Sequence, residues 1–322
     1  MKVWKSPVFH FGVLLVVAVV GLLIAPFIID WNGYRADLEA YGRKLTGRQV
    51  TIEGPISARL FPWPRLTAEN VAIANPPGMD KDHLASAGRI TIHMTLTGLL
   101  RGGLDVESIE VEQPVVHLER STEGQVNWML SPAEDLIRSD VLSRVSLDQI
   151  SLTGGEVQFR DRRRGETVRL EGFDAAVASP RVAGPWRVRA TADYEGRPIE
   201  LGINTASYAE GEPFRFGVRF SPADRSGLVY SFDGAASDGM AEGQIRIEPA
   251  AAGDGKTDAE GSLRPLVFTA RAKGDFERVA FTNIEVSRLG PGETGAIATG
   301  EAALSLGRQI AAEVDLRAAM LD

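Results

Sequence analysis

Residues 50–60 read VTIEGPISARL, two short runs in which apolar and polar side chains alternate. Val50 and Ile52 are the apolar members of the first run, and Gly54-Pro55 separates it from the second. Alternation with a period of two is the pattern of a half-buried β-strand, and Gly-Pro is a turn signal. The stretch therefore predicts a strand, a turn and a second strand.

The same pattern recurs along the rest of the chain, where Gly and Pro clusters separate short alternating runs. The candidate strands are residues 66–74, 86–96, 106–120, 147–160, 167–178, 186–194, 198–204, 214–220, 228–232, 244–248, 266–272, 279–286, 296–306 and 309–316. The chain has 34 glycines and 17 prolines, which favours many turns over a helical bundle. Hairpin-length spacing predicts a mostly β fold, an elongated, curved antiparallel sheet with a few short helices.

Some of these runs are interrupted. Gln113-Pro114 and Gly154-Gly155 each divide a long run, and we interpret each case as a strand, a break and a second strand. The likeness of the two units indicates a repeated strand pair. A change of phase between Ala68 and Val71 predicts a bulge or bend.

Two segments follow a helical period instead. In residues 32–45 apolar side chains recur every three to four positions, Asn32 is a suitable N-cap, and Gly47 is a C-terminal stop. We expect this helix to pack its apolar stripe on the first sheet. Residues 131–145 begin with Ser131-Pro132, a helix-start signal, and are predicted to form a helical connector between two sheet regions.

Residues 8–29 read VFHFGVLLVVAVVGLLIAPFII and contain no Asp, Glu, Lys or Arg. A run of about 20 apolar residues is long enough for a helix to cross the hydrocarbon core of a bilayer. Lys2 and Lys5 precede the run, so residues 1–7 are predicted to be a cytoplasmic tail and the rest of the chain to lie across the membrane. A cleaved signal peptide and a buried core helix are the alternatives.

The composition limits the classes of function. The chain has 322 residues, a formal net charge of −8 and no cysteine. Since phosphate binding needs a basic face, the net charge argues against nucleic acid as a partner. The lack of cysteine excludes disulfides, thiolate metal sites and cysteine nucleophiles.

No motif predicts an enzyme active site, a metal site or a cofactor. His83, His93 and His117 are scattered without metal-ligand spacing, and Gly102-Gly103 and Gly154-Gly155 lack the helix start that a phosphate loop needs. We therefore expect no catalytic, metal or cofactor-binding residues, and we interpret both glycine pairs as hairpin connections.

Residues 160–164 read RDRRR, a basic run in a predicted turn. A solvated hairpin tip is the simplest interpretation, and contact with an anionic lipid headgroup or an acidic partner is the alternative. The alternating apolar faces also leave two interpretations open. They form either an ordinary core or the wall of a long apolar channel.

The first 130 residues or so contain several short motifs: Asp30-Trp31-Asn32-x-Tyr34, Leu45-Thr46-Gly47-Arg48-x-Val50-x-Ile52-x-Gly54, Pro62-x-Pro64, Asn75-Pro76, Leu118-Glu119-Arg120, Gly124 and Asn127-Trp128. Together these motifs resemble the AsmA family. The remainder is similar only in its β-rich, glycine-punctuated style. The resemblance implies an anchor in the inner membrane of Gram-negative bacteria, with the bulk of the chain in the periplasm.

The resemblance also implies a fold and a role, that of a bridge-like lipid transfer protein with a bent antiparallel sheet and an apolar concave face. We then expect residues 8–29 to be the transmembrane anchor, 30–130 an AsmA-like periplasmic region, and 146–322 a β-rich groove that continues if the chain is a piece of a longer protein. The implied role is phospholipid transport between inner and outer membranes and outer-membrane homeostasis. The alternative is a scaffold for outer-membrane protein assembly that carries no lipid.

The expected partners are membrane phospholipids, with outer-membrane assembly factors as the alternative. A bent sheet with one apolar face replaces water around a lipid tail at about 0.8 kcal/mol per CH₂ group. The side chains that we expect to contact lipid are Ile90, Ile92, Met94, Val115 and Leu118.

Overall fold

The computed structural model describes residues 29–101, 105–129, 147–181, 183–209, 211–224, 226–250, 265–275, 277–288, 296–307 and 310–318. Nearly all of the predicted anchor, the tail before it, the predicted connector at 131–145 and Gly102-Gly103 lie outside these ranges. Among the described residues, no helix has the length and apolar character needed to cross a membrane.

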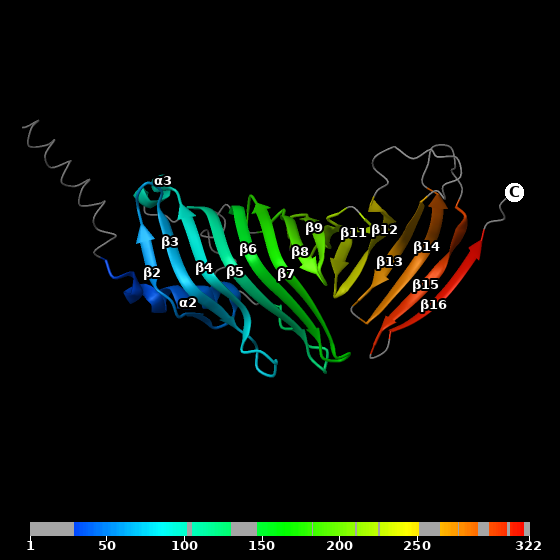
Figure 1. Ribbon diagram of the computed structural model, residues 1–322, viewed down its shortest axis with the longest axis horizontal. Helices are drawn as coiled ribbons and strands as arrows, with labels where there is room; N and C mark the ends of the chain where they lie inside the picture. The colour runs from blue at the N-terminus through cyan, green and yellow to red at the C-terminus, as the bar shows by residue number, and fades with distance from the viewer. Residues whose placement is uncertain are drawn as a thin grey trace, which may run out of the picture.

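The described strands form one open, curved sheet of 16 strands (Figure 1). The order along the sheet follows the order along the chain, except that β1 and β2 both pair with β3. The strands are β1 Val50–Ile52, β2 Ile56–Arg59, β3 Arg65–Ala74, β4 His83–Met94, β5 Val106–Arg120, β6 Leu147–Asp161, β7 Glu166–Ser179, β8 Arg187–Tyr194, β9 Arg197–Thr205, β10 Phe214–Pro222, β11 Leu228–Ser237, β12 Met240–Pro249, β13 Leu266–Gly274, β14 Arg278–Arg288, β15 Ala298–Leu306 and β16 Ile310–Ala318. Neighbouring strands lie about 4.8 Å apart, so the path from β1 to β16 is about 65 Å long. The prediction of an elongated, mostly β fold is confirmed.

The described helices are few and short: η2 (Trp31–Tyr34), α2 (Arg35–Thr46) and α3 (Leu96–Leu100). The predicted helix at 32–45 is confirmed, and Gly47 ends it in the left-handed conformation. Its start differs, because Asp30 rather than Asn32 accepts the capping hydrogen bond of the first turn. The prediction that its apolar stripe packs on the sheet is wrong, because Tyr34, Tyr41 and Leu45 are exposed.

Helix α2 lies beside the first strand of the sheet (Figure 1). Ile52 N donates to Glu39 Oε1 over 2.8 Å, and Arg35 donates to the carbonyl oxygen of Ile52. Ile56 N donates to Asn32 Oδ1 over 3.1 Å. These side chains satisfy backbone groups that an edge strand otherwise leaves open.

The strand pairings are antiparallel with one exception, which corrects the prediction of an all-antiparallel sheet. Strands β5 and β6 pair in parallel, from Ser108 opposite Gln149 to Arg120 opposite Asp161. Parallel neighbours need a long crossover connection, and the chain between these two strands spans residues 121–146.

The interruptions inside β3, β5 and β6 are bulges and not chain reversals. Asn70, Gln113, Gly154 and Gly172 all have positive φ, in β3, β5, β6 and β7 respectively. Because neighbouring strands carry matching extra residues, the pairings of β3 with β4, β4 with β5, and β5 with β6 keep one register across this line. The phase change predicted near Ala68 is confirmed, whereas Gly154-Gly155 is wrongly interpreted as a hairpin.

The pairings align one residue from each strand between β2 and β16 into a row that crosses the sheet, here called the inner row. It contains Ile56, Ala68, Ile90, Val111, Leu152, Ala175, Ala190, Leu201, Phe220, Tyr230, Ile247, Phe268, Val286, Ala298 and Ala318. Every member is apolar or aromatic. Paired residues share a face of the sheet, so one face presents a continuous apolar band.

The adjacent row, here called the outer row, points to the opposite face. It contains Ser57, Thr67, Thr91, Glu110, Ser151, Ala176, Arg189, Gly202, Arg219, Ser231, Arg246, Thr269, Glu285, Thr299 and Arg317. Its members are hydroxyl, charged or small residues. The sheet therefore has an apolar face and a polar face.

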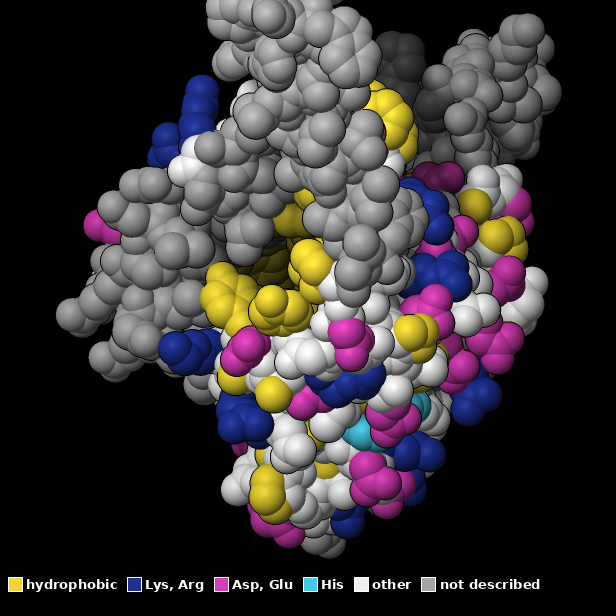
Figure 2. Space-filling model, turned by 90° about the vertical axis from the view of Figure 1, so that its left-hand side faces the viewer, with side chains coloured by type: hydrophobic (Ala, Val, Ile, Leu, Met, Phe, Trp, Pro, Cys, Tyr) yellow, Lys and Arg dark blue, Asp and Glu magenta, His cyan; other side chains and the backbone are white. Residues whose placement is uncertain are grey.

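No second layer of described secondary structure covers the apolar face, since the described strands belong to one sheet. Side chains on this face stay accessible: Tyr230 is 41% exposed, Leu266 49% and Val314 61%. In a sandwich core such side chains are buried. Of the two interpretations left open by the sequence, an apolar groove fits the described part of the chain. In the end view, hydrophobic side chains lie inside a hollow and along its lower edge, and charged side chains lie farther out (Figure 2).

Candidate functional site: an apolar groove

The groove is richest in aromatic side chains near the middle of the sheet. Phe216 and Phe232 have ring centroids 5.4 Å apart, and Phe220 and Tyr230 have centroids 6.0 Å apart. These pairs come from the adjacent strands β10 and β11, and all four residues lie on the apolar face. Aromatic rings that contact each other at a tilt bury a large apolar area, so the four rings form one apolar wall.

A hollow of about 210 Å³ opens into the apolar face beside these rings. Its walls include Leu170 and Phe173 of β7, Ile199 and Leu201 of β9, and Phe220 of β10. Apart from Thr191, its lining side chains are apolar or aromatic. Such a surface favours hydrocarbon, because it removes apolar area from water and offers few hydrogen-bonding groups in exchange.

The residues predicted to contact lipid fall in different places. Ile90 and Ile92 lie on the apolar face, where they pair with Val111 and Ile109. Leu118 lies on the same face, paired with Phe159.

Val115 lies on the polar face, in register with Ser86 and Glu156. The bulge at Gln113 shifts the phase of β5, so that Val116 takes the apolar side. Met94 ends β4 at an irregular pairing with Val106 and is half-buried. Whether any of these side chains contacts lipid stays a prediction.

Sequence reasoning missed the groove residues of the central strands, above all Leu201, Phe220, Tyr230 and Phe268. Each was a member of a predicted alternating run, so the signal was present. Only the pairing register tells which alternating residues of different strands share a face.

The motif residues Asn75 and Asn127, which carried part of the family resemblance, meet in the structure. Asn127 is fully buried, and its Nδ2 donates to Asn75 Oδ1 over 2.8 Å and to the His117 carbonyl oxygen over 2.7 Å. Its Oδ1 accepts from Glu119 N over 2.8 Å. Both the Nδ2 and the Oδ1 groups of the buried amide are therefore hydrogen-bonded, and they fix the chain that follows β5.

The basic run at 160–164 is not a solvated hairpin tip. Asp161 is 2% exposed, Arg164 Nε lies 3.4 Å from its Oδ2, and Arg162 Nη1 lies 3.3 Å from Glu119 Oε1. Arg160 pairs with Asp80. The prediction of a solvated tip is wrong, because the arginines of the β6–β7 turn pair with the buried carboxylates of Asp161 and Glu119.

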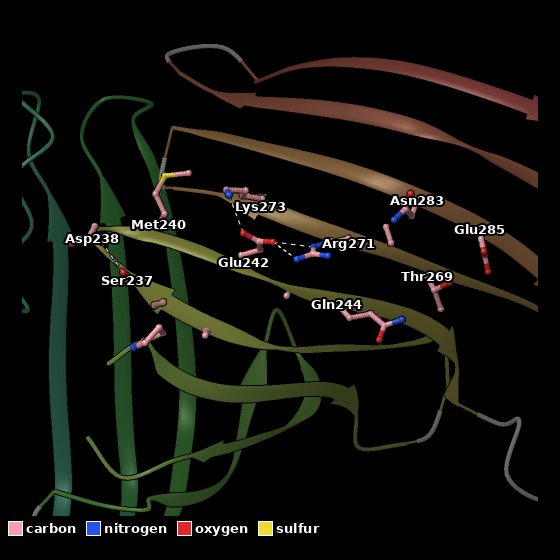
Figure 3. A pocket seen from close by; sticks show the side chains of 15 residues that line it. Ser237, Asp238, Met240, Glu242, Gln244, Thr269, Arg271, Lys273, Asn283 and Glu285 are labelled. Atoms are coloured by element: carbon pink, nitrogen blue, oxygen red, sulfur yellow. Dashed lines mark hydrogen bonds and ion pairs between the residues drawn. The ribbon is translucent and has the colours of Figure 1, made fainter. Parts of the chain in front are cut away.

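A polar hollow of about 850 Å³ lies between β11, β12, β13 and β14 (Figure 3). Glu242 lies between Lys273, whose Nζ is 2.9 Å from Oε2, and Arg271, whose Nε donates to Oε1 over 2.9 Å. Hydrogen bonds from Lys273 and Arg271 hold the pKa of the Glu242 carboxyl below its usual range. This carboxylate is therefore ionised and paired at neutral pH, unlike a proton donor poised for catalysis.

The described ranges contain no group of three or more His, Cys, Asp or Glu placed to hold a metal ion. What the geometry does provide is a long apolar trough in one face of an open sheet. The fold and this trough define the class of protein: a β-sheet groove protein, whose binding surface is its apolar face.

The chain belongs to the AsmA family, whose profile matches residues 1–287. It is 25% identical, over 284 aligned residues, to the AsmA family protein YhjG of Escherichia coli (strain K12). The match covers 76% of this chain and 40% of YhjG, so the chain spans less than half of that relative. No solved structure matches the chain significantly.

Proposed function

We propose that the protein shields the acyl chains of phospholipids in its apolar groove and so assists phospholipid transport between the inner and outer membranes. The observation that carries the proposal is the inner row, apolar in every strand from β2 to β16 and left uncovered by any described layer. Each CH₂ group moved from water onto such a surface gains about 0.8 kcal/mol. Membership of the AsmA family supports an envelope role related to lipid or to the outer membrane.

In this proposal the apolar segment at residues 8–29 anchors the chain in the inner membrane and the sheet lies in the periplasm. The role is non-enzymatic, since moving a lipid along an apolar wall needs no covalent step. A path of about 65 Å across the sheet serves as a track for acyl chains.

Native mass spectrometry of the full chain, purified in a mild detergent, tests the proposal. We expect phospholipid to remain bound after detergent exchange, in an amount that falls when the inner row is made polar. A preparation that carries no phospholipid, and takes none up from vesicles, would contradict the proposal.

The second candidate is a scaffold for outer-membrane protein assembly, and strand β16 favours it. Every residue of β16 is exposed, and among the described strands it pairs with β15 alone. An exposed strand edge is a template for pairing with another chain. Crosslinking from β16 that captures assembly factors, while phospholipid flux stays normal in a deletion strain, would favour this role over lipid carriage.

A further inference from the structure

Two turns far apart in sequence meet across the groove. Arg163, in the β6–β7 turn, donates from Nη1 to Glu277 Oε1 over 2.7 Å, and these residues are 114 positions apart. Arg120 Nη2, at the end of β5, lies 3.7 Å from the same oxygen. We call Arg120, Arg163 and Glu277 the clasp. The sheet curls far enough for the β5–β7 end of one arm to reach the β13–β14 end of the other.

The first half of the clasp rests on a buried carboxylate. Asp161 is 2% exposed, and its Oδ2 lies 3.9 Å from Arg120 Nη1 and 3.4 Å from Arg164 Nε. A buried carboxylate is tolerated when cations surround it. The pairing therefore holds Arg120 at the rim of the groove, where Glu277 approaches from the other arm.

The second half of the clasp is Glu277, which is exposed and whose turn is held by the Asp275 side chain. The Glu277 side chain is 63% exposed, and Asp275 Oδ1 accepts from the backbone N of Glu277 and Arg278 over 2.7 and 2.8 Å. Within the described ranges, no backbone hydrogen bond joins the β6–β7 turn to the β13–β14 turn. Arg120 and Arg163 are 8% and 23% exposed, and water screens their shared partner Glu277. Ion pairs with a solvent-exposed partner contribute little stability, so the contact opens at small cost.

Beside the clasp lies a hollow of about 440 Å³, here called the chamber, whose walls include Arg120, Asp161 and Arg164 as well as apolar side chains. One arm supplies Leu118, Phe159 and Trp128, and the ring centroids of Trp128 and Phe159 are 6.0 Å apart. The other arm supplies Leu306 and Asp275. Because Leu118, Phe159 and Leu306 all belong to the apolar face, the sheet curls with that face inward.

We propose that this chamber is a binding site for an acyl chain of a phospholipid and that the clasp gates it. The inference rests on the proposed function and adds a place and a gate to it. With the clasp closed, a chain in the chamber is enclosed by both arms. With the clasp open, the arms separate and the lipid enters or leaves sideways.

The absence of cysteine from the chain allows a specific test. In the full chain, Arg163→Cys with Glu277→Cys is bridged by a flexible bis-maleimide, and exchange of a fluorescent phospholipid with vesicles of phosphatidylethanolamine and phosphatidylglycerol is followed. We expect the bridge to slow exchange about tenfold or more relative to the unbridged double variant. The matched control is Glu69→Cys with Arg89→Cys, an ion pair of neighbouring strands whose bridging cannot change the distance between the arms.

Equal exchange rates with and without the bridge overturn the gate while leaving the proposed function standing. Failure of the unmodified chain to exchange lipid at all overturns both. Leu306→Trp, which adds side-chain volume to the chamber and leaves the backbone hydrogen bond from Leu306 N to the Glu277 carbonyl oxygen in place, provides a second test. We expect it to lower bound phospholipid, and unchanged binding would show that no acyl chain occupies the chamber.

Discussion

The two faces of the sheet differ in polarity and charge, although adjacent residues of the same strands build them. The inner row is apolar from Ile56 to Ala318, while the outer row carries hydroxyls and charges from Ser57 to Arg317. On the polar face the charges pair with one another across strands, as Arg89 does with Glu69 at 3.2 Å and Glu112 at 2.9 Å. Charged side chains on the polar face therefore find their partners on neighbouring strands of the same face. The apolar face has no described layer over it.

This difference shows that the alternating strands of the described ranges do not build a closed core. A sheet that buries its apolar face needs a second sheet or a layer of helices. Here α2 covers one edge, and the curl of the sheet brings described apolar residues of the two arms close to each other beside the clasp. The consequence is a long apolar surface that no described element covers.

The largest expected effect comes from a charge placed on the apolar face. Phe220→Glu puts a carboxylate in the middle of the inner row, where it costs free energy beside hydrocarbon. We expect co-purified phospholipid, measured by native mass spectrometry, to fall about tenfold or more. The control is Ser231→Glu, one strand away on the polar face, which we expect to leave lipid binding unchanged. Equal losses in the two variants would remove the distinction between the faces.

The next effect concerns stability at the rim of the apolar face. Asp161→Asn removes the buried charge between Arg120 and Arg164, and breaking such a pair costs about 3–5 kcal/mol of unfolding free energy. Urea denaturation followed by circular dichroism measures the loss. The control is Glu171→Gln, because the Glu171 side chain is 68% exposed and its Oε1 lies 3.9 Å from Arg169 Nη1. We expect little change in its unfolding free energy. An Asp161→Asn variant as stable as the parent would show that the cluster does not hold this end of the sheet.

A smaller loss of stability is expected where the bulges of β5 and β6 lie side by side. A Cβ on Gly155 would lie 2.7 Å from Pro114 Cγ and 2.9 Å from the Pro114 carbonyl oxygen, so Gly155→Ala forces neighbouring backbone apart. We expect a loss of about 1–3 kcal/mol in unfolding free energy. At Gly202, on the polar face, the nearest atom to an added methyl group is Arg219 Cβ at 3.9 Å, so Gly202→Ala fits. If both variants unfold alike, β5 and β6 do not approach each other this closely in solution.

The smallest effect is electrostatic and lies on the polar face. The folded pKa of Glu242 is depressed below its ordinary value of 4.5 by Lys273 and Arg271, so its contribution to stability is present at neutral pH. That contribution is lost as the pH falls below about 4.5 and through the folded pKa. Glu242→Gln should therefore flatten the acid side of the stability profile slightly, as measured by thermal unfolding between about pH 3 and pH 7. An unchanged acid slope would mean that the Glu242 pairs are not formed in solution.

Much of the fold followed from local patterns. Alternation and glycine punctuation predicted the strands, Gly47 predicted the end of α2, and the phase change after Ala68 predicted the bulge at Asn70. These features depend on residues close together in sequence, where a single chain carries the information.

The candidate site was predicted less completely, because it depends on pairing between distant segments. Val115 was assigned to the groove although the extra residue Gln113 reverses the phase of β5 and sends Val116 there instead. The parallel pairing of β5 with β6 has no local signal. The contact of Arg163 with Glu277 joins residues 114 positions apart, which periodicity does not report.

The central claim is that acyl chains lie against the apolar face, and site-specific photocrosslinking in cells tests it most directly. A photoreactive phenylalanine analogue is placed in the full chain at Tyr230, on the inner row, or at Arg246, on the outer row. The groove account predicts phospholipid adducts at position 230 and none at position 246, as measured by mass spectrometry of the purified protein. Adducts of equal yield at both positions, or none at position 230, would contradict it.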